Sequence, residues 1–443
     1  MADQPQGAPT PYAAPAAGAV AVYRGATLFD GTGRPPRPAT TIVTDGQTIT
    51  AVAPDADADL ASRLPGDARV FELDGRFVIP GLIDTHQHLA TPPDRPAAEA
   101  ALRRHVHSGI TAVRDMADDL RQIGDLARAT LVGEIPGPDI RYAALMAGPG
   151  FFDDPRTHQV SQGAVPGEVP WMQAVTPATD LPLAVAMARG TYAAAIKVYA
   201  DLDAELVAAV TAEAHRQGIP VWAHATVFPA TPGEVVAAGV DTVSHVTLLA
   251  FEGTPDGLTS YKTKPPVDHA RFAAGDDAHL DRLFARMARR GTVLDATAAM
   301  WESAELAGEG PEDAARARAN TALAAAVTAQ AHRAGVAIST GTDHETAPGA
   351  PFPALHDELA FLVERCGIPT ADVLRSATLI GARAAGAEAT MGSVEPGKLA
   401  NFAVLDEDPL RDIANLRSIT VTVKRGHRFD RAAFEEGRRT PRP

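Results

Sequence analysis

Two kinds of hydrophobic pattern divide the chain. Residues 19–77 carry short β-like runs, among them VAVYRGATLFDG and TTIVTDGQTITAVAP, with Asp45-Gly46 and Asp74-Gly75 as turn dipeptides. The C-terminal stretches ANFAVLDEDP and SITVTVKRGHRFD have the same character. Most of the chain between the two ends alternates instead between apolar strands and helices. We therefore expect the two chain ends, residues 19–78 and 386–443, to pair into one small β-sandwich module.

The middle of the chain predicts an α/β fold with eight strand-helix units. The candidate strands are residues 78–84, 110–115, 139–146, 194–200, 219–225, 240–246, 291–297 and 336–343. Eight units fit a (β/α)8 TIM barrel over residues 79–385, because an open doubly wound sheet would use fewer strands and usually a Gly-rich phosphate turn. The irregular interval 147–180 is too long for a routine loop, and we expect it to overhang the mouth of the barrel.

Charge and composition exclude several kinds of partner. The 443 residues are 45% hydrophobic and 21% charged, which is ordinary globular composition, and the formal net charge is −15. Nucleic acids and anionic membranes are bound by clustered Lys and Arg, and the sequence has no such cluster. The remaining expectation is a small-molecule substrate, without nucleic acid or membrane partners.

The chain also lacks signals for export. Residues 1–18 have no basic start of a signal peptide and are broken by proline, so they predict a disordered tail. No apolar segment approaches the roughly 18 residues needed to cross a bilayer. The single cysteine, Cys366, cannot form an internal disulfide. We expect a cytoplasmic protein; whether it forms a homo-oligomer is left open, because no diagnostic interface is visible in the sequence.

Candidate chemistry lies at the carboxyl ends of the predicted strands, where TIM barrels place their active sites. His86 and His88 end the first strand two residues apart, so in an extended chain both imidazoles project from one face, about 7 Å apart along the strand. The other strands contribute Lys197, His224, His245 and Asp343. Imidazole nitrogen and carboxylate oxygen are preferred ligands of zinc and related ions, so the set predicts a metal centre.

Lys197 is the unusual member of this set. A charged ammonium near divalent cations would be repelled, and burial would lower its pKa. The amine can stay neutral, or it can add CO₂ to become a carbamate whose oxygens bridge two cations. We favour carboxylated Lys197, because four imidazoles and Asp343 alone would leave two dications poorly neutralised.

These residues lie in motifs that resemble the metal-dependent amidohydrolase superfamily. The motifs are PGLIDTHQH, GITAVRD, AIKVYADLDAELVAAVTAEAHRQGIPVWAHA, GVDTVSHV, STGTDH and MGSVEPGKLANFAVLDEDPLRDI. Within that superfamily they are similar to the binuclear branch with a carboxylated lysine, which includes prolidase-like, ochratoxinase-like and imidazolonepropionase-related hydrolases. The resemblance runs from about residue 20 to 430.

The resemblance implies a role for each candidate. His86, His88 and Asp343 would hold one divalent ion, expected to be Zn²⁺, His224 and His245 a second, and carboxylated Lys197 would bridge them. A hydroxide shared by the two ions would attack a carbonyl, and Asp343 would act as general acid and base.

Further residues are candidates for the mouth of the barrel or its surface. Tyr199 lies two residues after Lys197, so its phenol should face the barrel mouth and could stabilise the oxyanion, or it could simply pack there. His105 and His107 form a second pair, but in a helix they diverge, which predicts surface residues. Arg114 and Asp115 suggest an ion pair near the mouth. Pocket candidates outside the metal set are His344, Trp301, His158, Arg156 and Trp171.

The function expected from these observations is hydrolysis of an amide bond in a small molecule, such as an N-acyl amino acid or an Xaa-Pro-like dipeptide. Three alternatives stay open: a lactone, ester or phosphotriester hydrolase at the same centre, a mononuclear deaminase, and a non-catalytic metal-binding barrel. No G-x-S-x-G elbow, P-loop or HExxH helix is present, so serine hydrolase, nucleotide-driven and zincin chemistry lack support.

Overall fold

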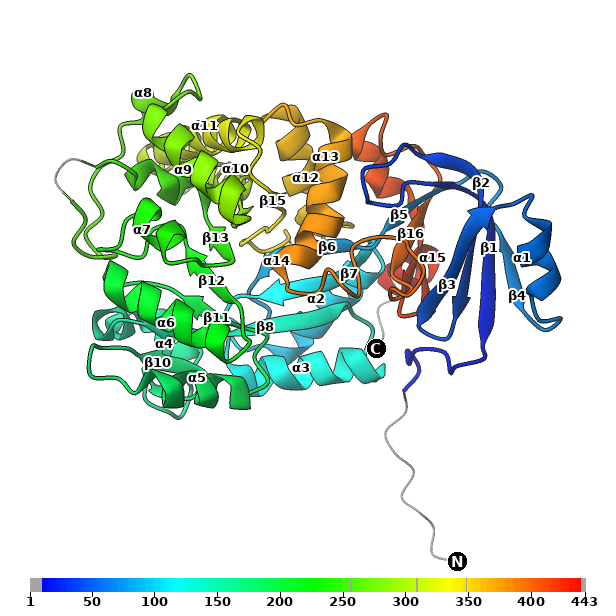
Figure 1. The fold of residues 1–443 in the computed structure, drawn as a ribbon, viewed down its shortest axis with the longest axis horizontal. Helices are drawn as coiled ribbons and strands as arrows, with labels where there is room; N and C mark the ends of the chain where they lie inside the picture. Colours follow the sequence, from blue (N-terminus) through cyan, green and yellow to red (C-terminus); the bar gives the residue numbers. More distant parts are fainter. Residues whose placement is uncertain (1–9, 255–256, 308–309, 348, 440–443) are drawn as a thin grey trace, which may run out of the picture.

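The computed structural model of the chain describes residues 10–254, 257–307, 310–347 and 349–439. Its elements form two neighbouring bodies, a large barrel and a smaller β-module made from both chain ends (Figure 1). The predicted fold class is therefore confirmed. Within the described ranges, no helix has both the length and the apolar character that a membrane crossing requires.

Eight parallel strands form the barrel. In their order around the sheet they are β6 (Leu82–Gln87), β7 (Ile110–Asp115), β8 (Asp139–Ala147), β11 (Ala195–Val198), β12 (Val221–His224), β13 (Thr242–Ser244), β14 (Val293–Asp295) and β15 (Ile338–Ser339). The last and first strands meet where the backbone N–H of Thr85 donates to the Thr340 carbonyl at 2.8 Å and that of Asp343 donates to the His86 carbonyl at 3.0 Å. These bonds bring the end of β15 against β6 and so nearly close the ring.

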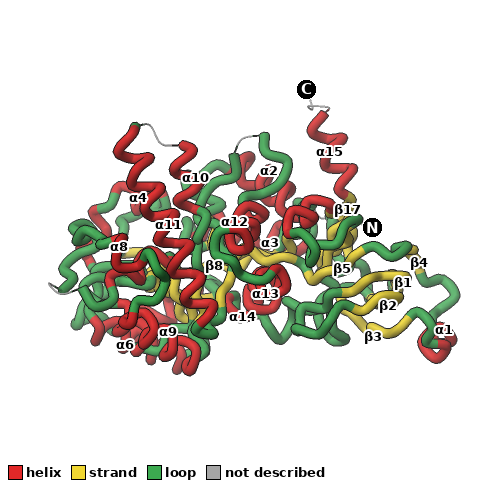
Figure 2. Tube along the Cα trace, turned by 90° about the horizontal axis from the view of Figure 1, so that it is seen from above, coloured by secondary structure: helices red, strands yellow, loops and turns green. Residues whose placement is uncertain are grey.

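Helices surround these strands, as the view from above shows (Figure 2). The longer ones are α2 (Arg95–Val106), α3 (Leu120–Val132), α5 (Leu181–Gly190), α6 (Ala204–Arg216), α9 (Ala278–Arg290), α10 (Met300–Ala307), α11 (Pro311–Arg333) and α12 (Leu355–Glu364). Shorter ones are α4 (Pro155–Gln159), α7 (Pro232–Ala237), α8 (His269–Phe272), α13 (Thr370–Arg375) and α14 (Gly381–Ala384). Single helical turns are η1 (Pro149–Asp153), η2 (Val246–Phe251), η3 (Ser376–Ile380) and η4 (Ile413–Ser418).

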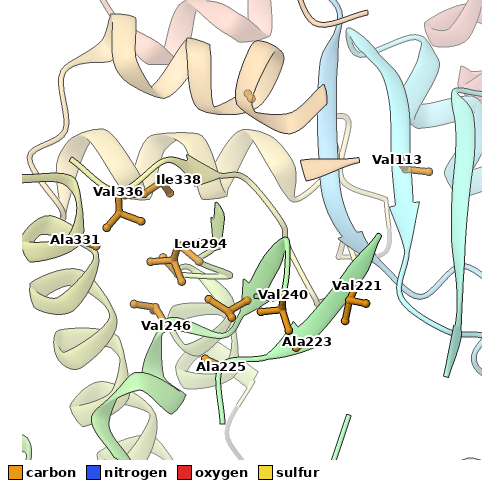
Figure 3. Close-up of a cluster of buried hydrophobic side chains, with 14 of the residues drawn as sticks. Val113, Val221, Ala223, Ala225, Val240, Val246, Leu294, Ala331, Val336 and Ile338 are labelled. Atoms are coloured by element: carbon orange, nitrogen blue, oxygen red, sulfur yellow. The ribbon is translucent and has the colours of Figure 1, made fainter. Parts of the chain in front are cut away.

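Strand alternation decides what faces the helices and what fills the barrel. Val221 and Ala223 of β12 belong to the apolar layer between strands and helices, part of which is drawn in Figure 3. Between them Trp222 joins a different cluster, and His224 lines the barrel cavity. Successive residues of a strand point to opposite faces, so one short strand supplies both core and site.

Helix α9 shows how local sequence sets the helix ends. Asp277 accepts hydrogen bonds from the backbone N–H groups of His279 and Leu280, which caps the first turn. Gly291 ends the helix in the left-handed conformation, with φ of 75°.

The β-module is one hydrogen-bonded sheet built from both chain ends. Its strands, in order, are β18 (His427–Asp430), β17 (Ile419–Lys424), β16 (Phe402–Leu405), β5 (Phe77–Pro80), β1 (Val20–Leu28), β2 (Arg37–Asp45) and β3 (Thr48–Pro54), with β4 (Arg69–Glu72) also paired to β1. Tyr23, Leu28 and Phe402 belong to its own apolar core. Helix α1 (Ala58–Arg63) precedes β4, and α15 (Arg431–Arg439) follows β18.

The run predicted as a single first strand, residues 78–84, is divided between the two bodies. Residues 77–80 form β5, which pairs with β1 and β16 of the module, and β6 of the barrel begins only at Leu82. The break is at Gly81, where an added Cβ would lie 2.1 Å from the Thr111 hydroxyl oxygen. The predicted boundary between residues 78 and 79 therefore falls inside β5.

Two further segments differ from simple expectation. Residues 1–9 of the predicted disordered tail lie outside the described residues, but Tyr12 stacks on Phe429 at 5.9 Å and donates its backbone N–H to the Gly133 carbonyl. The long interval 147–180 contains η1, α4 and two short strands, β9 (Glu168–Val169) and β10 (Met172–Ala174), of which β10 pairs with β8.

Candidate metal centre

All the predicted metal-ligating residues line one cavity at the carboxyl ends of the barrel strands. They are His86 in β6, His88 just after it, Lys197 in β11, His224 ending β12, His245 after β13 and Asp343 after β15. The cavity has a volume of about 450 Å³. Side chains separated by more than half of the sequence thus meet in one place, as expected for a TIM barrel.

Asp343 lies at the middle of the histidines. Its Oδ1 is 3.4 Å from Nε2 of His86 and 3.6 Å from Nε2 of His88, while its Oδ2 is 3.5 Å from Nδ1 of His245. His86, His245 and Asp343 offer ligand atoms close enough to hold one metal ion. The backbone has positive φ at His245 and Asp343, 72° and 52°, which is strained for residues other than glycine and occurs often at functional sites.

A layer of carboxylates behind the histidines orients them. Nδ1 of His86 donates to Oδ2 of Asp295 at 2.7 Å, and Nδ1 of His88 donates to Oδ1 of Asp118 at 3.0 Å. With the proton held on Nδ1, the lone pair of each Nε2 faces Asp343. Metal-ligating histidines commonly carry this carboxylate partner, which fixes the tautomer and the ring.

Asp295 is also the partner of the buried Arg114. The guanidinium donates to Oδ2 of Asp295 at 3.0 Å and to the Thr85 carbonyl at 2.6 Å, and it lies 4.4 Å from the centre of the Trp222 ring. The ion pair expected between Arg114 and Asp115 is therefore wrong. Arg114 neutralises Asp295 beneath the histidines instead, and Asp115 accepts a hydrogen bond from the backbone N–H of Leu89.

Two buried polar atoms of the cluster lack a hydrogen-bond partner in the described part of the chain: Nζ of Lys197 and Nδ1 of His224. Burial lowers the pKa of Lys197 to about 7, although Asp295 and Asp343 act in the opposite direction. Burial likewise lowers the pKa of His224, with Lys197 and His245 adding to the effect. Buried polar groups are almost always satisfied, so these two atoms indicate a missing partner. Burial favours the neutral form of His86, His224 and His245. These imidazoles, an amine with a lowered pKa and a carboxylate together fit divalent cations.

Aromatic residues form one wall of the cavity. The Tyr199 ring is 3.9 Å from the His224 ring and 4.4 Å from the Phe151 ring, measured between centroids. Tyr199 lines the cavity, as its spacing from Lys197 predicted. Phe151 and Arg156, from the 147–180 interval, line it too, so this interval does overhang the mouth.

Of the other pocket candidates, some line the cavity and some do not. Trp301 lines the cavity, whereas His158, Trp171 and His344 are not among its lining residues in the described chain. His344 is turned aside: its Nδ1 donates to the Thr342 carbonyl at 2.8 Å, and its Nε2 lies 3.1 Å from the hydroxyl of Ser303.

The second histidine pair is not on the surface, contrary to expectation. His105 and His107 are 3% and 5% exposed, because α2 is covered at its C-terminal end by other parts of the chain. The His107 ring stacks on Phe434 of α15 at 5.5 Å, and His356 of α12 lowers the pKa of His105 further, after burial and Arg104. The pair is structural.

Several lining residues had no signal in the sequence. Tyr261 and Lys264 come from the long connection after η2, and Met300 comes from the start of α10. None of them follows a periodic pattern. Asp295 and Asp118 could have been found as carboxylates at or just beyond strand ends, since Asp295 ends β14 and Asp118 follows β7 by three residues.

Comparison with known proteins found a family model that covers most of the chain. The family model described as the amidohydrolase family matches residues 77–428. Comparison with curated proteins found no match.

Several solved structures share the fold. A Xaa-Pro dipeptidase with bound methionine has 22% identity and a TM-score of 0.70, over 93% of this chain and 100% of that chain. The ochratoxinase of A. niger has 22% identity and a TM-score of 0.71, over 94% and 96%. Molinate hydrolase has 18% identity and a TM-score of 0.72, over 96% and 98%.

Proposed function

Since the chain belongs to the amidohydrolase family and is a hydrolytic enzyme, we propose that it uses two divalent metal ions to cleave an amide bond of a small molecule. N-acyl amino acids and Xaa-Pro-like dipeptides are the leading substrate classes. The observation that carries the proposal is the convergence of His86, His88 and His245 on Asp343. Beside them lies Nζ of Lys197, which has no hydrogen-bond partner among the described residues.

Each metal ion has a candidate ligand set. His86, His88 and Asp343 would hold the first ion, and His224 and His245 would hold the second. Carboxylation of Lys197 would place two oxygens where Nζ now lacks a partner, and a carbamate would bridge the ions and neutralise charge. We propose Zn²⁺, because imidazole and carboxylate donors suit it. When bound, such ions polarise a carbonyl and lower the pKa of water toward neutrality.

Asp343 is the proposed proton carrier. Burial raises the pKa of its carboxyl group, an effect that His88 and Lys197 oppose. A carboxylate with a raised pKa accepts the proton of the attacking water more readily and can return it to the departing amide nitrogen. Its position between the histidines is therefore suited to both transfers.

Tyr199 is the proposed hydrogen-bond donor to the carbonyl oxygen as negative charge develops there. Burial raises the pKa of its phenol well above the ordinary value, so the hydroxyl keeps its proton at neutral pH. Its ring lies against His224, next to the site that the second metal ion would occupy. Preorganised donors of this kind contribute through charge stabilisation in the transition state.

The experiment is a metal count combined with a carbamate assay. The wild-type protein should bind two metal ions per chain, measured by plasma mass spectrometry, and should give a carbamate resonance in ¹³C NMR after labelling with ¹³C-bicarbonate. Lys197→Ala should lose the resonance and at least one metal ion. Lys262→Ala is the matched control, because that lysine pairs with Asp153 and does not line the cavity.

A substrate panel then separates the alternatives. The panel contains N-acyl amino acids, Xaa-Pro dipeptides, lactones and phosphotriesters. One metal ion per chain with unmodified Lys197 would favour a mononuclear deaminase. Turnover of lactones or phosphotriesters without amide cleavage would replace the amide assignment. A protein with both metal ions that hydrolyses nothing on the panel would favour a binding protein.

A further inference from the structure

Three loops meet over the metal-ligating cluster. Residues 258–264 cross the cavity and are tied to the loop after β11 and to η1. The Ser260 hydroxyl and the Tyr261 backbone N–H donate to Oδ1 of Asp201 at 3.3 and 3.2 Å, and Nζ of Lys262 donates to Asp153 at 3.2 Å. We call residues 258–264 the roof segment. Its contacts fix the side chains that face the cavity.

Tyr261 packs directly over the site. Its ring centroid is 5.6 Å from that of Tyr199 and 6.0 Å from that of His224. It is also 6.2 Å from the Phe151 ring, so apolar and aromatic surface surrounds the space between roof and histidines. Tyr261 therefore forms part of the wall that a substrate at the metal centre would face.

Lys264 brings a cation to this roof. Its Nζ lies 4.0 Å from the centre of the Tyr261 ring and 5.9 Å from that of Phe228, and the residue lines the cavity. Lys264 is close enough to the cluster to contribute to lowering the pKa of His224, after burial, Lys197, His245 and His86. A cation over a tyrosine face is held in place without being neutralised.

The neighbouring cations have partners, but Lys264 has no carboxylate partner within the described ranges. Arg156 forms an ion pair with Asp154 at 2.6 Å, and Lys262 forms one with Asp153. The carboxylates that line the cavity, Asp118 and Asp343, belong to the histidine cluster. The roof therefore carries a positive charge that forms no ion pair with a carboxylate of the described residues.

We propose that Lys264 on the Tyr261 ring is the subsite for a carboxylate on the substrate. The inference rests on the proposed function and deepens it, since it makes Lys264 a determinant of substrate specificity. The apolar wall of Phe151 and Tyr199 takes the hydrocarbon part of the substrate, and the ammonium takes the anionic end. Neutral amides fit the same space but lack the charge contact.

The kinetic test compares matched substrates in matched variants. N-acyl amino acids and their neutral primary amides are assayed with wild type, Lys264→Met and Lys398→Met. Lys264→Met should lower kcat/KM for the carboxylates about tenfold and for the neutral amides less than about twofold, the size expected of a charge-assisted contact at a partly exposed site. Lys398→Met should leave both unchanged, because that lysine pairs with Glu395 and does not line the cavity, and Lys264→Arg should restore most of the preference. An unchanged preference for carboxylates in Lys264→Met overturns the proposal.

A binding test keeps this inference separate from the hydrolase assignment. Calorimetry with the metal-loaded protein measures 4-phenylbutyrate against the neutral 4-phenylbutyramide in wild type and Lys264→Met. The metal centre is the same in both proteins, so its own attraction for carboxylate cancels in the comparison. Loss of about tenfold in affinity for the anion alone supports the subsite even if no amide on the panel is cleaved. Equal loss for both probes, or no loss, overturns it.

Discussion

Replacing Asp295 by asparagine tests whether one buried carboxylate organises the candidate metal centre. Its two oxygens accept four hydrogen bonds, from Thr85 at 2.8 Å, His86 at 2.7 Å, Ser244 at 2.9 Å and Arg114 at 3.0 Å. An asparagine amide offers one acceptor oxygen and turns an NH₂ group toward the remaining donors. It also leaves the guanidinium of Arg114, fully buried, without its ion-pair partner.

The expected cost follows from these contacts. Each buried donor left without a partner costs about 1–3 kcal/mol, and breaking a buried ion pair from one side costs about 3–5 kcal/mol. The hydroxyls of Thr85 and Ser244 can rotate, so the charge of Arg114 dominates, and we expect a loss of about 3–4 kcal/mol in the free energy of unfolding. Metal affinity should fall about 10- to 100-fold, because His86 loses the carboxylate that fixes its tautomer.

The assays are urea unfolding followed by circular dichroism, and a competition titration with a zinc chelator. Asp84→Asn is the control: this buried carboxylate forms no ion pair within the described ranges, although it acts on Arg114 more weakly than Asp295 does, and its side-chain donors, on Gln87 and Thr342, can reorient. The double variant Asp295→Asn with Arg114→Met should regain part of the lost stability, since it removes the uncompensated charge. If Asp295→Asn costs less than about 1 kcal/mol and binds zinc normally, the description of this residue as the anchor is refuted.

Three further predictions concern other parts of the molecule. Gly81→Ala should destabilise the protein by about 2 kcal/mol or more in urea unfolding, because the added Cβ would overlap the Thr111 side chain. Gly66→Ala is the control and should be neutral, because a Cβ there would have no atom within 4 Å. Equal effects of the two substitutions on stability would contradict this explanation. Burial lowers the pKa of His356 to about 4. The contribution of His356 to the free energy of unfolding is therefore complete above the unfolded pKa near 6.5 and is lost as the pH falls toward 4. In His356→Gln the decline of stability over that range should be shallower by up to about 1.4 kcal/mol per pH unit, and parallel curves would refute the assignment. Tyr199→Phe should lower kcat at least about tenfold with little change in KM, measured by steady-state kinetics, and an unchanged kcat would leave this tyrosine with a packing role only.

The sequence could predict the parts of the fold and site that depend on local pattern. Each barrel strand is a short apolar run, and its last residues carry the chemistry, so Lys197, His224 and Asp343 could be placed from their own strands alone. Parallel strands end at the same rim, which is why residues far apart in the chain could be assigned to one centre. The spacing of His86 and His88 likewise needed only strand geometry.

What the sequence could not predict depends on contacts between distant segments. The burial of His107 depends on α15, which follows more than 300 residues later. The hydrophobic periodicity of the helix around His107 cannot predict that contact. The partner of Arg114 is Asp295 rather than its neighbour Asp115. Arg114 of β7 and Asp295 of β14 reach the barrel interior from strands that are not adjacent, and so they meet there. Lys264 sits on an irregular connection without periodicity, and its position emerges only from the ties to Asp201 and η1.

The pairing of β5 with β16 restricts the order in which the sheet can form during synthesis. Phe402 faces Pro80 in that pairing, so the strand adjoining the start of the barrel stays an open edge until nearly the entire polypeptide has left the ribosome. Contacts of such long sequence separation slow folding, and until they form the unpaired strand edges stay exposed. Translation that stops before residue 402 would therefore release a chain whose β5 has no β16 to shield it, and such fragments should associate with one another or with chaperones rather than persist as free barrels.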